Sequence, residues 1–237
     1  MIFRTLIIVL SFAIFSGCAS TTLAPQTANK MQQSRIATAA YVVDKKIVYN
    51  EMVYKGLYNE TRTQEAVFDG FWDIDQAYTE TLTSVLAELN LNASAASQAL
   101  SDDNQARFEQ SVKQSLAAAQ NSDQYTFALD SGVRSSLTEA GYDYLVLLRT
   151  PHLMVNTTSM IDSATIMIPS ALIILDLSEN REELNDFLLV QGFTDYEESV
   201  RELELNNLAL IKTATNPRLR MGLENRLADI LAIERKN

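Results

Sequence analysis

The pattern of hydrophobic and polar positions predicts β-strands in the first part of the chain. Val, Ile, Tyr and Phe are enriched in three segments, Tyr41–Val43, Ile47–Tyr58 and Val67–Trp72. Polar residues at 44–46 and 59–63 separate these segments, so strands joined by turns are the simplest interpretation. Apolar residues occupy both alternating sets of positions in the second segment, which is typical of a strand covered on both faces.

A helical period replaces this pattern from Asp75 onward. Five apolar residues then fall on one helical face: Tyr78, Leu82, Val85, Leu86 and Leu89. Asp73, with Gln76 three residues later, resembles a capping box, and Asp75 is the alternative cap. Two more amphipathic helices are predicted at about 103–120 and 130–140, after a small, polar connection at 90–101.

Two buried strands are predicted in the central region. Tyr142–Leu148 is apolar and ends shortly before Pro151. Ala164–Leu177 is the most apolar interior stretch, too short to span a bilayer. Because it contains Pro169, we expect a strand that is kinked or bulged at this residue. A buried helix that starts at Pro169 is the alternative.

The C-terminal region, 180–237, is predicted to be helical. Helices are expected at Glu182–Val190 and Tyr196–Lys212. Asn216-Pro217 is typical of an N-cap followed by Pro at the first helical position. An apolar stripe follows, made of Leu219, Leu223, Leu227, Ile230 and Leu231. The whole pattern predicts an α/β fold, with α+β as the alternative: one mixed sheet flanked by helices, with a helical C-terminal section.

The N-terminus has the pattern of an export signal. Arg4 precedes the apolar run Leu6–Phe15, which is shorter than the ~20 residues of a membrane-spanning helix. The sequence Phe15-Ser16-Gly17-Cys18 resembles a bacterial lipobox, although Phe15 stands where Leu is usual. The resemblance implies a signal peptide at 1–17 and lipidation of Cys18. An ordinary cleaved signal that happens to end at this cysteine is the alternative.

The expected location follows from the same resemblance. Ala19, directly after Cys18, implies sorting to the outer membrane, on its periplasmic face. Residues 18–35 are polar and aperiodic, which predicts a lipidated tether. Residues 36–237 are then a single periplasmic globular domain. Cys18 is the only cysteine, so no disulfide is expected, and a hydrophobic content of 47% is enough for a core.

Charge limits the classes of partner. The net charge is −11, and cleavage that removes Arg4 makes it −12. The densest basic pair is Lys45-Lys46, whereas nucleic acids and anionic headgroups require larger Lys/Arg patches. We therefore expect no nucleic-acid partner, contact with a membrane through the lipid anchor, and an envelope protein as the binding partner.

The order of elements resembles a known class of domain. Strands and a helix that opens with Asp lie in Ile47–Leu89, and Gly141–Val146 and Leu175-Asp176-Leu177 follow later. This layout is similar to the compact α/β domains of outer-membrane lipoproteins, among them penicillin-binding-protein activators and the curli-secretion lipoprotein. The resemblance covers about residues 40–180, and no binding residue is carried over from it.

Motifs for cofactor, metal or nucleophilic chemistry are missing from the sequence. His152 is the only histidine, and the chain has neither a calcium-loop pattern nor a Gly-x-Ser-x-Gly elbow. The sequence also lacks a glycine-rich nucleotide loop. We therefore expect no metal and no cofactor. His152, in a loop after a strand, is a candidate catalytic residue, with a partly exposed structural residue as the alternative.

Clustered carboxylates give the best enzymatic hypothesis. Asp69, Asp73 and Asp75 surround Phe71 and Trp72, and glycosidases use carboxylate pairs beside aromatic residues. In the alternative interpretation the last two aspartates cap a helix and the tryptophan packs in the core.

The sequence favours a non-catalytic binding or scaffold protein of the cell envelope. One alternative is an envelope hydrolase that acts on a glycan or on peptidoglycan through an acidic pair. The other is a carrier of a small apolar ligand, with a cavity lined by Ile166, Ile168, Leu172 and Ile174.

Overall fold

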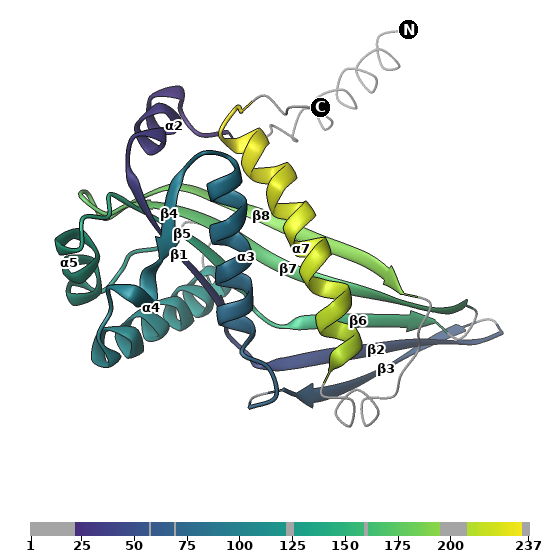
Figure 1. The fold of residues 1–237 in the computed structure, drawn as a ribbon. Coiled ribbons are helices and arrows are strands. Elements are labelled where there is room, and N and C mark those ends of the chain that lie inside the picture. The colour runs from purple at the N-terminus through teal and green to yellow at the C-terminus, as the bar shows by residue number, and fades with distance from the viewer. Residues whose placement is uncertain are drawn as a thin grey trace, which may run out of the picture.

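The computed structural model describes residues 22–56, 58–68, 70–121, 126–158, 161–194 and 208–233. They form a mixed sheet with helices on both sides, which confirms the predicted α/β fold (Figure 1). The strands are β1 (Arg35–Val42), β2 (Lys46–Lys55), β3 (Tyr58–Val67), β4 (Asn92–Ala95), β5 (Tyr144–Thr150), β6 (Leu153–Thr158), β7 (Ile161–Asp176) and β8 (Arg181–Thr194). The helices are α2 (Pro25–Gln32), α3 (Ile74–Glu88), α4 (Asp102–Asn121), α5 (Ser131–Glu139) and α7 (Ala209–Ile230), with a 3₁₀ turn at Ala96–Gln98.

The sheet is built around the long strand β7. Strand β8 pairs antiparallel along one edge of β7, and β5 and β6 share the other edge, one after the other. Strands β1 and β2 pair in parallel with β5 and β6, respectively. Strand β4 pairs with β1, and β3 pairs with β2, so these two strands lie along the far side of the sheet. Strands β5 and β6 therefore lie end to end beside β7, and β1 and β2 lie end to end beside them. Each of these two pairs takes the place of one long strand that is interrupted midway.

Pro169 lies where β7 has no partner on the side of β5 and β6, while its other side pairs with Leu189 of β8. The pairing of β7 with β5 ends at Ala171, and its pairing with β6 begins at Met167. The break coincides with Pro151-His152, between β5 and β6. Because proline has no N–H to donate, it is tolerated at a position where the neighbouring strand is interrupted. The segment is thus a strand, as favoured by the sequence, and the helical alternative is wrong. The bulge expected at Pro169 is also wrong, because the register with β8 is regular there and shifts between Ile174 and Leu175.

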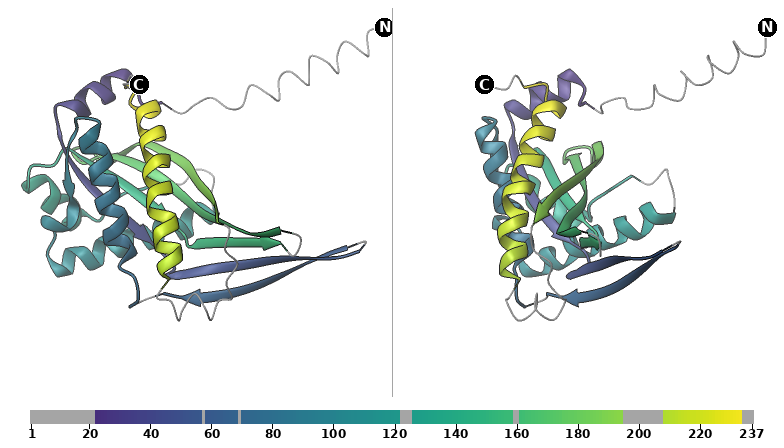
Figure 2. Two further views of the ribbon diagram at one scale, coloured as in Figure 1. Left: turned by 45° about the vertical axis from the view of Figure 1, so that its right-hand side comes forward. Right: turned by 90° about the vertical axis from the view of Figure 1, so that its right-hand side faces the viewer.

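Two hydrophobic cores lie on opposite faces of the sheet. The first lies beneath α2, α3 and α7 and the second beneath α4 and α5. Figure 2 shows α3 and α7 on one side of the sheet and α4 on the other. Strand β5 contributes alternate residues to both, with Val146 in the first core and Leu145 and Leu147 in the second. This double burial explains its continuous apolar sequence.

The helix predicted at Glu182–Val190 is wrong, because this segment belongs to strand β8. Leu184, Leu188 and Val190 face the first core, and the intervening Phe187 and Leu189 are exposed. Apolar side chains on both faces of the strand obscured the two-residue period that the buried positions follow.

The C-terminal helix begins earlier than predicted. Helix α7 contains Pro217 in its interior, so the N-cap predicted at Asn216 is wrong, and Leu208 precedes the first turn. Ile211 and Thr215 are buried together with the predicted stripe at 219–231. The apolar face therefore runs through the proline, and packing outweighs the local cost of that residue. Residues 196–207 of the helix predicted at Tyr196–Lys212 lie outside the described residues, and 209–212 form the first turn of α7.

The predicted tether extends too far along the chain. Residues 22–35 belong to the folded domain, because α2 buries Met31 and the Leu23 N–H donates to the Ile230 carbonyl over 3.2 Å. Lys30 also pairs with Asp176 over 3.1 Å. The short amphipathic pattern of α2 starts after Pro25, a sequence signal that the polar composition concealed.

The β2–β3 hairpin also differs from the prediction. The turn expected at 59–63 lies inside β3, and the strand expected at Val67–Trp72 is the end of β3 and a loop. Most of β3 is exposed, so its polar sequence is compatible with a strand that buries little. The predicted helices α3, α4 and α5 and strand β5 are confirmed. No helix among the described residues is long and apolar enough to cross a bilayer.

Candidate functional site

Side chains of α3 accept hydrogen bonds from the part of strand β1 that has no neighbouring strand on one side. Strand β4 pairs only with Arg35–Thr38, which leaves the later N–H groups of β1 without a neighbouring strand on that side. Asp75 accepts the Val42 N–H over 2.8 Å, and Thr79 accepts the Ala40 N–H over 2.8 Å. Buried N–H groups are costly when unpaired, so both side chains have a structural role.

Asp73 caps helix α3. Its side chain accepts the Gln76 N–H over 3.2 Å, which is the N-cap half of the predicted capping box, while the Gln76 side chain donates to Glu80. A carboxylate is also favourable here because of the partial positive charge at a helix N-terminus. Asp75 does not cap the helix, because its hydrogen bond goes to β1 instead.

Asp75 is also paired with a lysine. The Lys45 ammonium contacts its second oxygen and lies 4.8 Å from the centroid of the Tyr41 ring. Burial raises the pKa of Asp75, and this effect outweighs the opposing effects of Lys45 and the Val42 N–H. Nearby Asp73 raises the pKa further. Both oxygens of Asp75 thus have structural partners.

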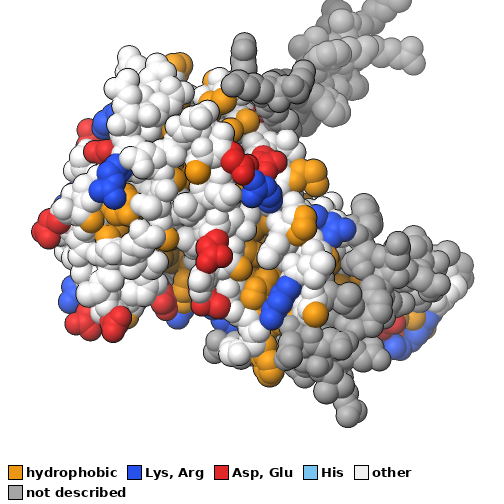
Figure 3. Space-filling model, viewed as in Figure 1, with side chains coloured by type: hydrophobic (Ala, Val, Ile, Leu, Met, Phe, Trp, Pro, Cys, Tyr) orange, Lys and Arg blue, Asp and Glu red, His pale blue; other side chains and the backbone are white. Residues whose placement is uncertain are grey.

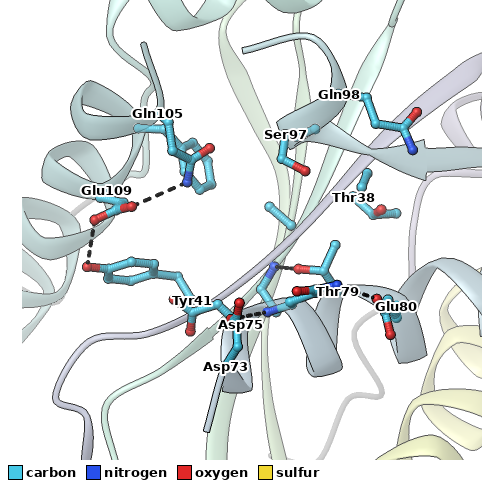
Figure 4. A pocket seen from close by; sticks show the side chains of 16 residues that line it. Thr38, Tyr41, Asp73, Asp75, Thr79, Glu80, Ser97, Gln98, Gln105 and Glu109 are labelled. Atoms are coloured by element: carbon cyan, nitrogen blue, oxygen red, sulfur yellow. Dashed lines mark hydrogen bonds between the residues drawn. The ribbon is translucent and has the colours of Figure 1, made fainter. Parts of the chain in front are cut away.

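A polar pocket of about 510 Å³ lies between β1, α3 and α4, beyond the end of β4 (Figure 4). Its lining includes Asp73, Asp75, Glu80 and Glu109. Tyr41 reaches across it and donates to Glu109 over 3.4 Å, and Gln76 donates to Glu80 over 2.8 Å. Asp73 and Asp75 are therefore brought to one pocket, as the enzymatic hypothesis requires, but each also holds a backbone amide.

The other residues of the enzymatic hypothesis lie elsewhere. Trp72 does not line the pocket; its ring packs edge-on against Tyr78, with 5.9 Å between centroids, and 5.7 Å from Phe68. Asp69 lies outside the described residues, as does Cys18. The tryptophan is thus placed as a packing residue at the edge of the first core.

His152 is half-buried in the break between β5 and β6 and does not line the pocket. Burial lowers its pKa, and nearby Lys46 lowers it further. The described residues contain no group of three or more His, Cys, Asp or Glu side chains that could hold a metal ion. The four residues expected to line an apolar cavity, Ile166, Ile168, Leu172 and Ile174, are packed in the first core.

Part of the second sheet face is not covered by a described helix. Helices α4 and α5 pack over β1, β5 and the end of β7, whereas the β2, β6, β7 and β8 region has apolar side chains outside both cores. Directly paired residues share a face, and the pairs Ala171–Phe187, Pro169–Leu189 and Met154–Met167 trace this region. We call it the open sheet face; its apolar members are Val48, Met154, Met167, Pro169, Phe187 and Leu189, and it is bordered by Ala171, which packs against the second core.

The open sheet face is apolar between β7 and β8, and a charged residue, Arg149, borders it on β5, where it is buried and donates to Ser115 of α4. Phe187 is 68% exposed and Leu189 39% exposed. Its polar members between β2 and β6 are uncharged, for example Asn50 and Asn156, which are hydrogen-bonded over 3.0 Å. The opposite side of the molecule is different, because Asp, Glu, Lys and Arg are interspersed over α3 and α7 (Figure 3). Exposed Phe187 and Leu189 beside partly buried apolar neighbours form an apolar patch, which is typical of an interaction site.

Sequence reasoning did not find the open sheet face. Phe187 and Leu189 lie in the segment that was predicted to be helical, and β6 was not predicted at all. The only sequence signal for a strand is the even spacing of Leu184, Leu188 and Val190, which the apolar Phe187 and Leu189 between them obscure.

Comparisons with known proteins show similarity of fold only at a low level. No protein-family model and no curated protein sequence matches the chain. The hypothetical protein CT253 from Chlamydia trachomatis aligns with a TM-score of 0.43 and 10% identity, over 85% of this chain and 99% of that one. Lipoprotein GNA1162 from Neisseria meningitidis has a TM-score of 0.33 and 9% identity, over 76% of this chain and 99% of that one. The LpoB C-terminal domain from Salmonella enterica has a TM-score of 0.25 and 13% identity, over 73% of this chain and 99% of that one.

Proposed function

We propose that this chain is a lipid-anchored protein on the periplasmic face of the outer membrane, and that it binds an envelope protein without catalysing a reaction. The open sheet face is the observation that carries the proposal. It presents Phe187 and Leu189 to solvent in a chain whose net charge is −11. Exposing such side chains costs solvation free energy, which a bound partner recovers when it covers them.

The composition of the face suits protein recognition. Met154 and Met167 are paired neighbours at its centre. Methionine side chains are flexible and polarisable, so they adapt to the shape of a partner. Phe187, which pairs with Ala171 farther along β7 and β8, is a large exposed aromatic side chain of the kind that can anchor a partner.

The anchor proposed at Cys18 adds to binding at this face. Acylation would restrict the domain to a membrane surface and raise the effective concentration of partners in the same membrane. A moderate affinity at the open sheet face would then be sufficient.

The pocket beside α3 gives a hydrolase less support. A catalytic carboxylate needs a free oxygen directed at its substrate, and one of the pair needs a raised pKa. Asp75 has a raised pKa, but one oxygen holds Val42 and the other contacts Lys45. These two contacts give Asp75 a structural role, so a catalytic role is not needed to account for a carboxylate at this position.

Crosslinking in cells tests the proposal. The native protein is crosslinked, purified and analysed by mass spectrometry beside the Cys18→Ser variant, which cannot be acylated. We expect a specific envelope protein in the wild-type sample, its loss in the variant, and wild-type protein in the membrane fraction. Recovery of no specific envelope protein would contradict the binding function, and soluble wild-type protein would contradict the anchor.

A further inference from the structure

Helix α2 begins a short stretch of chain after the proposed anchor. Leu23 is the first buried residue of the described chain, and its N–H donates to the Ile230 carbonyl at the end of α7. It lies five positions after Cys18, and an extended chain covers at most about 3.6 Å per residue, so the link spans no more than about 18 Å. A bilayer that holds Cys18 is therefore close to α2, which starts at Pro25.

The β2–β3 hairpin lies at the opposite end of the domain (Figure 2). Asp176, at the end of β7, pairs with Lys30 of α2. The start of β7 pairs with Thr158 of β6, which also pairs with Met52 of β2, so the hairpin tip lies beyond that end of β7. The sixteen residues of β7 extend over about 50 Å at 3.3 Å per residue. The domain is thus much longer than the link to the anchor.

Helix α2 has no acidic side chain to present to a bilayer. The chain has a net charge of −11, yet residues 18–34 contain no Asp and no Glu. Exposed side chains of α2 include Gln26, Asn29 and Gln32, which are uncharged. Anionic headgroups repel carboxylates, so α2 can approach them more easily than an acidic surface can.

Two acidic side chains from β7 and β8 contact α2, and both are largely buried and paired. The Asp176 side chain is 5% exposed and binds Lys30 over 3.1 Å. The Glu183 side chain is 13% exposed, accepts the Thr27 hydroxyl over 3.3 Å and pairs with Arg181 over 2.6 Å. These contacts hold α2 on the sheet and neutralise the carboxylates beside it.

We propose that the short link holds α2 on the surface of the bilayer in which Cys18 is anchored, and that the tip of the β2–β3 hairpin points away from that surface. The inference rests on the proposed function, because it requires the lipid anchor, and it adds the orientation of the domain. Phe187 pairs with Ala171, five positions from Asp176, or about 17 Å along β7. A partner on the open sheet face is then bound within reach of the same bilayer.

Fluorescence quenching from the bilayer tests this orientation. Cys18 is the only cysteine, so once it is acylated an introduced cysteine is the only free thiol that a fluorescent label can modify. The label is placed in the full chain at Gln26→Cys in α2 or at Tyr58→Cys near the hairpin tip, where Tyr58 is 64% exposed.

Each acylated, labelled protein is bound to the outside of vesicles of phosphatidylethanolamine and phosphatidylglycerol. The vesicles contain a lipid with a spin-labelled headgroup, which quenches the fluorescence of a label only at short range. We expect the label at position 26 to lose most of its emission and the label at position 58 to lose almost none. We also expect both variants to melt at the temperature of the wild type.

A lengthened link provides the matched control. Inserting about twenty Gly and Ser residues after Ser20 gives a flexible chain with an end-to-end distance of about 25 Å. We expect the label at position 26 to regain its emission, while the protein stays bound to the vesicles. Quenching that persists undiminished would overturn the role of the short link.

The outcomes distinguish the inference from the proposed function. An acylated, vesicle-bound protein with no quenching at position 26, or with stronger quenching at position 58, would overturn the orientation and leave the proposed anchor and binding function intact. An intact mass without acyl chains would contradict the anchor in the proposed function, and the inference with it.

Discussion

Arg226 of α7 binds the carboxylate of Asp186 in β8 through two hydrogen bonds. One joins Nη2 to Oδ1 over 2.7 Å, and the other joins Nε to Oδ2. The two side chains are 22% and 9% exposed. This bidentate pair fixes the end of the helix on the edge strand, four residues beyond Gly222 and eight beyond Arg218. The three residues lie on one face of α7, where they contact alternate residues of β8.

Removing Arg226 should destabilise the domain strongly. In Arg226→Met the Asp186 carboxylate remains largely buried without its cation, and such a loss typically costs about 3–5 kcal/mol. Urea unfolding followed by circular dichroism measures the change. Arg107→Met is the control, because its pair with Asp130 is more exposed and should contribute below about 1 kcal/mol. Equal effects of the two substitutions would contradict this account of how α7 is held.

Gly222 should tolerate no side chain, although it lies within a helix. Alanine normally stabilises a helix relative to glycine by about 1 kcal/mol. Here an added Cβ would lie 2.8 Å from a methyl carbon of Val190, so Gly222→Ala should lose stability, by about 1–3 kcal/mol.

A double-mutant cycle identifies the cause of that loss. Val190→Ala removes the methyl groups, so the two substitutions together should cost less than the sum of their separate effects. Additive costs would show that the close approach of α7 to β8 is not the reason for the glycine.

The burial of Asp75 should appear in the pH dependence of stability. Its pKa is raised above the usual 3.8, so the folded state binds this proton more tightly than the unfolded state. Burial of the charged form therefore lowers stability at neutral pH, and this penalty disappears as the pH falls towards 3.8. The free energy of unfolding of the wild type, relative to Asp75→Asn, should rise over that range. A difference that stays constant with pH would contradict the raised pKa.

Asp176 should show the opposite behaviour. Burial opposes its ionisation, but hydrogen bonds from Ser178, Lys30 and the Glu179 N–H outweigh this effect and lower its pKa. The stabilisation is thus complete above the usual pKa of 3.8 and is lost as the pH falls below it. Asp176→Asn should destabilise the domain at neutral pH, and its difference from the wild type should shrink in acid. A difference that grows in acid would contradict this assignment.

The sequence predicted the parts of the fold in which each face has a distinct composition. Helix α3 has a buried face of Tyr78, Leu82, Val85 and Leu86 and a polar remainder, so its period was clear. The Asp73 cap was predicted for the same reason, since its signal lies within four residues.

Long-range contacts decided the elements that were predicted incorrectly. In β8, exposed Phe187 and Leu189 made the segment look apolar all round, and its strand state depends on pairing with β7. Pro217 looked like a helix start, but burial of Ile211 and Thr215 extends α7 to its N-terminal side. The role of Asp75 also depends on a contact 33 positions away, with Val42, which no local motif encodes.

The open sheet face is the central element of this account, and a charge placed in it is the most direct test. Phe187→Asp and Met221→Asp each replace an exposed apolar side chain, so both should leave thermal stability nearly unchanged. The measurement is the yield, in cells, of the crosslinked complex with the envelope partner. We predict that Phe187→Asp abolishes the complex and that Met221→Asp retains it. A complex that persists in a folded Phe187→Asp variant would contradict the assignment of this face as the binding surface.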